Sequence, residues 1–191
     1  KLGDATKPFK LCAERIVSSG VTTVAAFDDH ALFIKDDGSL WAMGENDYGQ
    51  LGDGTTSSRQ SPGKIINSGV TAVAAGNYHS LFIKSDGSLW SMGKNTAGQL
   101  GDGTKTNQNS PVKVVDSEVV AARGGPTSSF YIKTDGSLWG MGGIDGNLGS
   151  SPMKIVDAGV TDISGYWGKL YYGKQNGSIW SYSVSKGHEK I

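Results

Sequence analysis

One five-residue pattern occurs four times in this chain, and it constrains the fold more than any other feature of the sequence. Three copies read Asp-Gly-Ser-Leu-Trp, and the fourth reads Asn-Gly-Ser-Ile-Trp. The copies occupy residues 37–41, 86–90, 135–139 and 176–180, so that their glycines are 49, 49 and 41 residues apart. A repeat of this length predicts an array of supersecondary units that bury their apolar faces on one another.

The composition fits one globular domain and argues against several classes of function. The chain has 191 residues, of which 29 are glycine, and its 18 basic residues balance 18 acidic ones. Because no basic excess is present to neutralise phosphate, we expect no nucleic-acid partner. No apolar run reaches the ~18 residues of a membrane span, so we expect no membrane association. The single cysteine, Cys12, cannot form an internal disulfide, which leaves the compartment open.

Each repeat predicts four short β-strands and no helix. In the second copy the strand-like runs are residues 69–76, 79–84, 88–93 and 111–115, bounded by Gly, Pro, Asn or Asp. The Asp-Gly or Asn-Gly pair between the second and third runs predicts a hairpin with a type I′ turn, in which both central residues have positive φ. We therefore predict an all-β fold, a β-propeller of four-stranded blades with four repeats of about 49 residues.

The two ends of the chain fall at nearly the same point of the repeat. Residues 2–6 match residues 51–55 at an offset of 49 residues. We therefore expect the N- and C-terminal segments to share one blade and close the ring, which removes exposed sheet edges. The predicted units are residues 20–68, 69–117, 118–158, and 159–191 together with 1–19. Because the chain starts without methionine and has no signal peptide, we expect that a preceding segment was removed.

A longer motif surrounds the first two copies of the pattern. Residues 90–101 read Trp-Ser-Met-Gly-Lys-Asn-Thr-Ala-Gly-Gln-Leu-Gly, residues 76–81 before them read Gly-x-x-His-Ser-Leu, and residues 44–52 match equally well. This motif resembles the repeat of the regulator of chromosome condensation family. The resemblance implies a β-propeller, usually of more blades than four. Three arrangements stay open: a four-bladed ring, several chains that assemble into a larger ring, or part of a longer propeller.

Residues that recur at one repeat position are interpreted as structural. His30 and His79 share their position with Ser128 and Lys169, which argues against a common metal or catalytic role, and the resemblance implies a bond across the blade. The carboxylates of the hairpin turns recur in the same way. Four tryptophans are expected to pack between neighbouring sheets: Trp41, Trp90, Trp139 and Trp180.

Known catalytic and metal-binding patterns are missing from the sequence. The Gly-Asp-Gly-Thr loops at residues 52–55 and 101–104 supply one acid each, which is too few for a calcium loop. They also lack the lysine and the following helix of a phosphate loop. We interpret them as turns held by bonds from the Asp side chain to the backbone. We therefore expect no enzyme activity, no metal site and no cofactor.

Loops that differ between the copies are the candidates for binding. In a propeller, the loop after the first strand of a blade and the loop after the third emerge on the same face. Here they carry acidic, amide and aromatic side chains that the repeat does not require, a composition found at recognition surfaces. The third copy lacks eight residues in its second loop, which predicts a notch beside Trp167. The predicted binding residues are Asp28, Asp29, Tyr48, Asn77, Tyr78, Tyr166 and Trp167.

The sequence therefore predicts a non-enzymatic binding module that recognises a protein partner through loops on one propeller face. The family includes a nucleotide-exchange factor for a small GTPase and a secreted inhibitor of β-lactamases, and the resemblance implies binding through such a face. The alternative is a carbohydrate-binding or surface-assembly module of a secreted protein, with Trp167, Tyr166 and Tyr78 as stacking platforms. Tyr166 and Trp167 could instead fill the space left by the shortened loop. A homo-oligomer that completes a larger ring is a further expectation.

Overall fold

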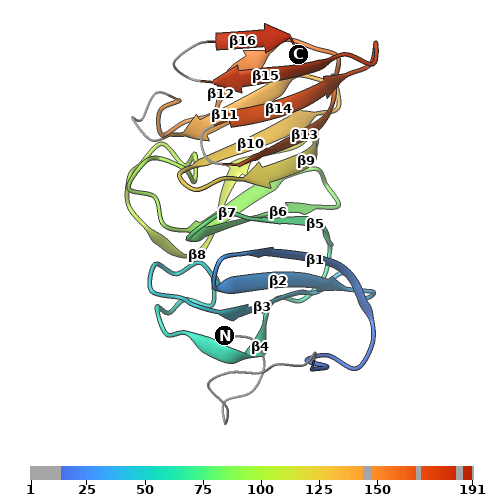
Figure 1. Ribbon diagram of the computed structural model, residues 1–191. Helices are drawn as coiled ribbons and strands as arrows, with labels where there is room; N and C mark the ends of the chain where they lie inside the picture. The colour runs from blue at the N-terminus through green and yellow to red at the C-terminus, as the bar shows by residue number, and fades with distance from the viewer. Residues whose placement is uncertain (1–13, 144–147, 167–168, 184–186, 191) are drawn as a thin grey trace.

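Sixteen β-strands in four antiparallel sheets make up the described part of the protein (Figure 1). The structure, a computed structural model, describes residues 14–143, 148–166, 169–183 and 187–190. Each sheet has four strands that follow one another in the sequence and pair in that order. The predicted all-β fold with four four-stranded blades is confirmed. Within the described residues, no helix is long and apolar enough to cross a membrane.

Each sheet contains one copy of the five-residue pattern, placed where its second strand turns into its third. The first sheet consists of β1 (Val21–Phe27), β2 (His30–Lys35), β3 (Leu40–Gly44) and β4 (Arg59–Ile66). The second consists of β5 (Val70–Ala75), β6 (His79–Lys84), β7 (Leu89–Gly93) and β8 (Gln108–Val115). The third consists of β9 (Val119–Gly124), β10 (Ser128–Lys133), β11 (Leu138–Gly142) and β12 (Met153–Val156). The fourth consists of β13 (Val160–Tyr166), β14 (Lys169–Lys174), β15 (Ile179–Ser183) and β16 (Gly187–Lys190).

The hairpin turn after each second strand is not the predicted type I′ turn. In the first sheet Gly38 has a φ of 73°, whereas Asp37 does not have a positive φ. The Gly38 N–H donates to the Lys35 carbonyl at 2.9 Å, and the Lys35 N–H donates to the Ser39 carbonyl at 3.1 Å. This is a three-residue loop with glycine in the left-handed position. The prediction was wrong because the Asp37 carboxylate accepts the Ser39 N–H at 2.9 Å, which holds the aspartate in an ordinary turn conformation.

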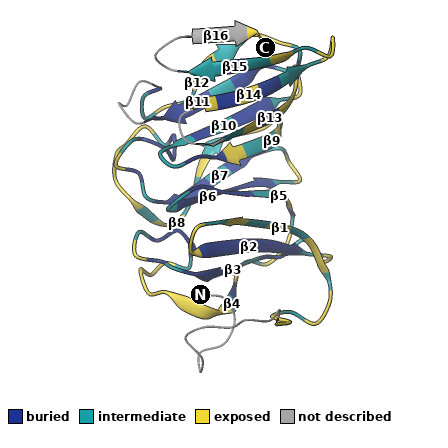
Figure 2. Cartoon of the chain, viewed as in Figure 1, coloured by how far each residue is buried: buried dark blue, intermediate teal, exposed yellow. Residues whose placement is uncertain are grey.

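Neighbouring sheets pack face to face through buried apolar side chains. Figure 2 shows that β2 and β6 are almost wholly buried, as expected for strands covered on both faces. The contact between the first and second sheets includes Leu32, Leu40, Val70, Phe82 and Met92. Equivalent clusters join the second sheet to the third and the third sheet to the fourth. The core therefore consists of three repeated layers, one between each pair of successive sheets.

The repeated tryptophan adds to these layers, as predicted. Trp90 stacks on Phe82 within its own sheet, with ring centroids 6.0 Å apart, and packs against the cluster shared with the first sheet. Its Nε1–H donates to the Ser88 hydroxyl at 2.9 Å, and the Lys84 ammonium lies 4.5 Å from the ring centroid. Trp139 and Trp180 pack in the same way against their preceding sheets.

The two histidines of the motif connect neighbouring sheets. The His30 Nε2 lies 3.0 Å from the Ser80 Oγ of the second sheet. The His79 Nε2 lies 2.8 Å from the Ser129 Oγ of the third sheet. Both rings are buried, so that neither is accessible to a substrate. The predicted structural role of His30 and His79 is therefore confirmed.

The four sheets form an open stack, and the predicted closure by shared terminal segments is not seen. In Figure 1 the first and fourth sheets lie at opposite ends of the stack, and successive sheets contact each other. The fourth strand of the last sheet is β16, which pairs with β15 from Trp180 opposite Lys190 to Ser183 opposite Gly187. The segment after Trp180 thus returns to its own sheet, so the last sheet obtains four strands without an N-terminal segment.

Candidate functional site

The two variable loops of the first sheet lie beside each other. Asp28 and Asp29 form the turn between β1 and β2, and Asp28 has a φ of 49°, a left-handed conformation that aspartate tolerates better than most residues. The Glu45 N–H, directly after β3, donates to the Asp29 carbonyl at 2.8 Å. This backbone bond joins the loop after the first strand to the loop after the third. Both loops therefore belong to one face of the molecule, which we call the loop face.

A buried asparagine holds the loop that carries Tyr48. Asn46 is fully buried, and its Oδ1 accepts the Leu51 N–H at 2.9 Å. Its Nδ2 donates to the Thr55 carbonyl at 3.1 Å and lies 3.2 Å from the Asp53 Oδ1. Asp53 in turn accepts the Thr55 N–H at 3.0 Å, which confirms the predicted turn role of this acid. The loop is thus anchored from inside, and the half-buried Tyr48 is held at its tip.

Tyr48 meets Tyr78 from the neighbouring sheet. Their ring centroids are 5.1 Å apart and their planes are tilted by 54°. The Lys94 ammonium lies 4.6 Å from the Tyr48 centroid and 5.0 Å from the Tyr78 centroid. The Lys94 N–H also donates to the Tyr78 carbonyl at 2.8 Å. Two sheets therefore contribute to one aromatic pair that carries a lysine over its rings.

Carboxylates surround this aromatic pair. Burial raises the pKa of Glu45, and the negative charges of Asp47, Asp29 and Asp28 raise it further. Partial burial also raises the pKa of the Tyr78 phenol, with added contributions from the negative charges of Glu45 and Asp28. Four carboxylates and one lysine thus share this part of the loop face. The site is acidic, and its electrostatics favour a positively charged partner.

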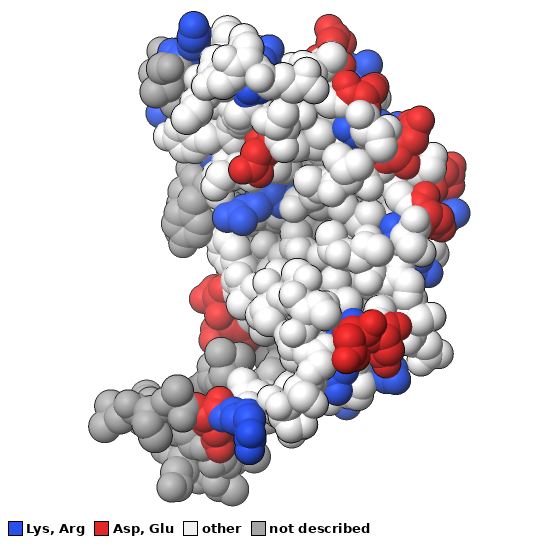
Figure 3. All heavy atoms as spheres, turned by 90° about the vertical axis from the view of Figure 1, so that its right-hand side faces the viewer, with Lys and Arg blue, Asp and Glu red and all other residues white. Residues whose placement is uncertain are grey.

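The opposite face, formed by the hairpin turns and the connections between sheets, has a different charge pattern. Figure 3 shows acidic and basic side chains interspersed over it rather than gathered by sign. Three ion pairs lie on or next to these connections: Lys113 with Asp116 at 3.3 Å, Lys133 with Glu118 at 3.3 Å, and Lys154 with Asp157 at 3.8 Å. Charges on this face therefore compensate each other locally, in contrast to the acidic site on the loop face.

The structure brings together five of the seven predicted binding residues and adds Glu45 and Lys94 to them. The five are Asp28, Asp29, Tyr48, Asn77 and Tyr78. Asn77 lies in the same loop as Tyr78, and its N–H donates to the Gly125 carbonyl of the third sheet at 3.1 Å. Trp167 lies outside the described residues, and Tyr166 is described only as the last residue of β13.

The sequence analysis missed Glu45 and Lys94. They occupy the same repeat position with opposite charge, and this difference between copies was the signal that could have found them.

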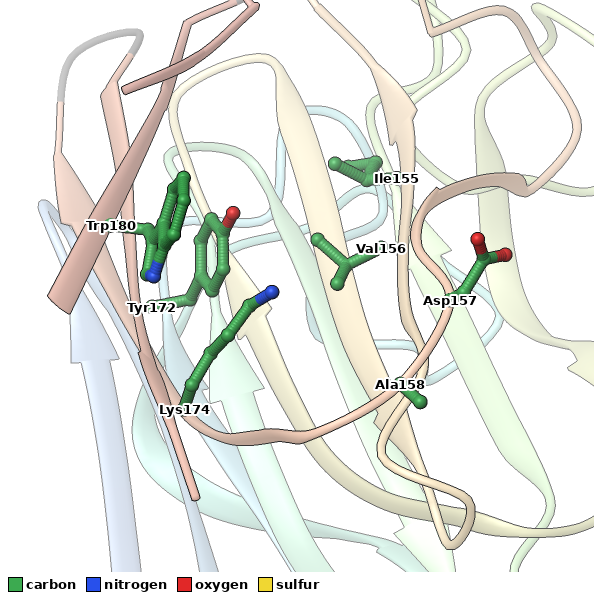
Figure 4. A pocket seen from close by; sticks show the side chains of 7 residues that line it. All are labelled: Ile155, Val156, Asp157, Ala158, Tyr172, Lys174 and Trp180. Atoms are coloured by element: carbon green, nitrogen blue, oxygen red, sulfur yellow. The ribbon is translucent and has the colours of Figure 1, made fainter. Parts of the chain in front are cut away.

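A separate pocket of about 350 Å³ lies between the third and fourth sheets. Figure 4 shows Trp180, Tyr172 and Lys174 on one side and Ile155 and Val156 on the other, with the Asp157 carboxylate turned away. The Lys174 ammonium lies 5.1 Å from the Trp180 centroid and covers that ring. The pocket is thus the outer rim of the contact between two sheets. Among the described residues, no group of three or more His, Cys, Asp or Glu side chains could hold a metal ion.

Solved structures with the same arrangement of sheets support the fold assignment. Human WBSCR16 is 25% identical over 85% of this chain and 47% of its own, with a TM-score of 0.75. Yeast RCC1 (Prp20), solved bound to Kap60, is 20% identical over 90% of this chain and 45% of its own, with a TM-score of 0.75. The computationally designed Ika4 protein is 14% identical over 90% of this chain and 99% of its own, with a TM-score of 0.53.

The chain spans just under half the length of the two natural proteins. A comparison with curated proteins found no match. The family model described as the regulator of chromosome condensation (RCC1) repeat matches residues 37–83 and 86–132. A second model of the same description matches residues 21–50 and 70–99, so that the matches together span residues 21–132. The chain therefore belongs to the RCC1 repeat family, and its sheets are RCC1-type propeller blades.

Proposed function

We propose that this protein is a non-enzymatic module that binds a protein partner through its loop face. The RCC1-type propeller fold supports a protein-binding role. The observation that carries the choice of face is the acidic site around Tyr48 and Tyr78, where loops of two sheets converge. Half-buried tyrosines beside charged groups provide apolar area and polar contacts at little cost in side-chain entropy, a combination enriched at protein interfaces.

The partner that suits this site presents basic side chains. Asp28, Asp29, Glu45 and Asp47 supply four negative charges, and the Lys94 ammonium lies over the Tyr48 ring beside them. A lysine or arginine from a partner would find both carboxylates and an aromatic edge within reach. The structure of Prp20p from Saccharomyces cerevisiae was described together with the binding properties of that protein to Gsp1p and histones. Histones are basic, which makes them a suitable first probe for this chain.

The proposed surface extends along the loop face to the fourth sheet. Asn77 bridges from the second sheet to the third through its bond to the Gly125 carbonyl. Tyr166 ends β13, whose position in the fourth sheet corresponds to that of β1 in the first. Asn77 and Tyr166 therefore remain part of the proposed surface, and Trp167, which directly follows Tyr166 in the sequence, is retained as a proposal.

The experiment that tests this proposal compares charge-neutralised variants of the two faces. The triple substitution Asp28→Asn, Asp29→Asn and Glu45→Gln removes three carboxylates from the loop face. The control, Asp116→Asn with Asp157→Asn, removes two carboxylates with side chains 92% and 97% exposed on the opposite face. Titration with purified histones and with Gsp1p, at several salt concentrations, measures the Kd.

We expect the loop-face variant to bind histones at least tenfold more weakly, because it has lost carboxylates that attract basic side chains. Its binding should also depend less on salt, since salt screens the attraction between exposed charges. The control variant should bind as tightly as the unmodified protein. Equal losses in both variants would indicate nonspecific charge attraction. Undiminished binding by the loop-face variant would rule out this face.

The carbohydrate alternative has less support from the aromatic residues that are described. Sugar rings stack on open aromatic faces, yet Lys94 lies over Tyr48 and Tyr78, and Lys174 lies over Trp180. Trp167 is the remaining candidate for a stacking platform. A glycan array that shows binding lost on Trp167→Ala would support this alternative.

A further inference from the structure

The aromatic pair on the loop face already holds one cation. The centroids of the Tyr48 and Tyr78 rings are 5.1 Å apart, and the Lys94 ammonium lies 4.6 Å from the first centroid and 5.0 Å from the second. The two centroids and the ammonium thus form a nearly equilateral triangle, so that the ammonium contacts both rings at once. The two tyrosines therefore form a site for an ammonium group, which we call the cation site.

The fold does not require the three side chains of the cation site. The residues 49 positions after Tyr48, Tyr78 and Lys94 have small or no side chains: Ala97, Thr127 and Gly143. The backbone is nevertheless the same at both places. The Lys94 N–H donates to the Tyr78 carbonyl at 2.8 Å, and the Gly143 N–H donates to the Thr127 carbonyl at 2.7 Å.

The loop that carries Tyr48 is likewise independent of the tyrosine ring. The Tyr48 N–H donates to the Gln50 Oε1 at 3.0 Å, and the Ala97 N–H donates to the Gln99 Oε1 at the same distance. Because the next repeat builds the same loop with alanine, Tyr48 is not needed to form it. The cation site is therefore an addition to the repeated frame, as expected for a binding site.

Lys94 is held in this site by the two rings. Among the described residues, no ion pair joins the Lys94 ammonium to a carboxylate. An ammonium over partly exposed rings is bound weakly, and a lysine side chain loses rotamer freedom when it is held in one place. Lys94 and both tyrosines are half-buried, so the site is accessible from solvent. A cation that contacts the rings and the nearby carboxylates together can therefore replace Lys94.

We propose that Lys94 is an internal ligand of the cation site, and that a lysine side chain of a protein partner displaces it. A lysine suits the site, because both rings already contact the ammonium of one. The carboxylates of the acidic site attract the positive charge of the incoming side chain. The inference rests on the proposed function, since it names the group through which a basic partner is recognised and the residue that restrains its binding.

An internal ligand lowers the affinity of its site for every cation from outside. The apparent Kd of the partner rises as the fraction of molecules with a free site falls. A site that its own lysine fills in about nine molecules of ten binds an outside lysine about tenfold more weakly than the empty site. Lys94 therefore determines how tightly a partner's lysine is held.

Titration with a short peptide tests this proposal. The peptide has blocked ends and one lysine between glycines, and a peptide with norleucine in place of the lysine is the neutral comparison. The NMR signals of the tyrosine ring protons measure the Kd. Lys94→Met removes the ammonium and keeps an unbranched side chain. We expect this variant to bind the lysine peptide about tenfold more tightly than the unmodified protein, and neither protein to bind the norleucine peptide.

Two controls separate displacement from simple loss of positive charge. Lys105→Met removes the same charge from an exposed position of the same connection between β7 and β8, and should leave the Kd unchanged. The ratio between the Kd values of the unmodified protein and Lys94→Met should also persist at high salt, because salt screens repulsion at a distance but not competition for the same rings. A ratio that vanishes at high salt would overturn the proposal.

The site itself can be removed without disturbing its loop. Tyr48→Ala added to Lys94→Met copies the Ala97 of the next repeat and should abolish the gain in peptide binding. In the unmodified protein, ring currents should shift the ε-methylene protons of Lys94, and saturation with peptide should move these signals to the values of an exposed lysine. Lys94 signals that stay unchanged at saturation would show that the peptide does not displace this side chain.

Histone titration separates this inference from the proposed function. Tighter peptide binding by Lys94→Met, with no histone binding by either protein, would support the cation site and overturn the proposed function. Histone binding with no gain in peptide affinity on Lys94→Met would support the proposed function and overturn the displacement of Lys94.

Discussion

The Nε2 atom of His79 lies 2.8 Å from the Oγ atom of Ser129, and this pair joins the second sheet to the third. The Ser129 hydroxyl donates its single proton to the Gln99 carbonyl at 2.8 Å. It can therefore only accept from the histidine, which places the ring proton on Nε2. The same assignment holds for His30, because the Ser80 hydroxyl donates to the Gln50 carbonyl at 2.7 Å. Both histidines are thus neutral donors inside a sheet contact.

Removing the serine hydroxyl should destabilise the fold. Ser129→Ala leaves the His79 Nε2–H without its acceptor and the Gln99 carbonyl without this donor, in a region that excludes water. We expect the free energy of unfolding to fall by about 1–3 kcal/mol, measured by urea denaturation. Ser151→Ala, at an exposed position, is the control and should change it by less than about 0.5 kcal/mol. A Ser129→Ala variant as stable as the control would show that the bond contributes nothing.

Acid should weaken the fold before its carboxylates titrate. Burial lowers the pKa of His30 from 6.5 to about 4 and that of His79 to about 3. Between pH 6.5 and about 4 the unfolded chain binds protons on these rings and the folded chain does not, so stability falls as the pH falls. Each unit by which folding lowers a histidine pKa corresponds to about 1.4 kcal/mol in the free energy of unfolding. Acidification should therefore remove several kcal/mol of stability through the two rings together.

Urea denaturation at pH 7 and at pH 4.5 measures this effect. The variant His30→Gln with His79→Gln retains a side-chain N–H for each serine but has no group that titrates in this range. Its stability should change much less between the two pH values than that of the unmodified protein. Equal stability of the unmodified protein at both pH values would show that the histidines remain accessible to protons in the folded state.

The architecture could be predicted from sequence because its signals are local. The Asp-Gly turn, the apolar strands beside it and Trp90 recur at a fixed period, and each acts within one sheet. Closure could not be predicted in this way. It depends on whether β16, a short segment with no counterpart in the motif, pairs with its own sheet or leaves that place to another segment. The repeat length alone does not distinguish these pairings.

The candidate site was predicted only in part. Differences between the copies identified the acids of the first loop and Tyr78, since variation at an exposed loop is visible in the sequence. Lys94 was missed because it directly follows a strand of the repeated motif, a position that is typical of the frame. Its role depends on contact with Tyr48 of the preceding sheet, 4.6 Å away, and such a contact arises only when two repeats pack together.

Two glycines at one repeat position should differ in their tolerance of a side chain. Gly101 and Gly149 have φ values of 76° and 74°, and alanine at either position costs about 1–2 kcal/mol of strain. A Cβ on Gly101 would also lie 2.5 Å from the Met141 sulfur in the next sheet, whereas a Cβ on Gly149 meets nothing within 4 Å. Gly101→Ala should therefore lower the melting temperature more than Gly149→Ala. An equal decrease in the melting temperatures of the two variants would indicate that the Met141 side chain moves aside at no cost.

Removing the anchor of the Tyr48 loop should reduce both stability and binding. Asn46→Ala leaves the buried Leu51 N–H without its acceptor and releases the loop. We expect the free energy of unfolding to fall by about 1–3 kcal/mol. Hydrogen exchange of the Leu51 amide should accelerate, and histone binding should weaken because Tyr48 and Glu45 lose their fixed positions. Asn67→Ala, at an exposed position between β4 and β5, should change neither. Faster exchange at Leu51 with unchanged binding would show that the partner does not depend on this loop, and the acidic site would then have to act through Asp28 and Asp29 alone.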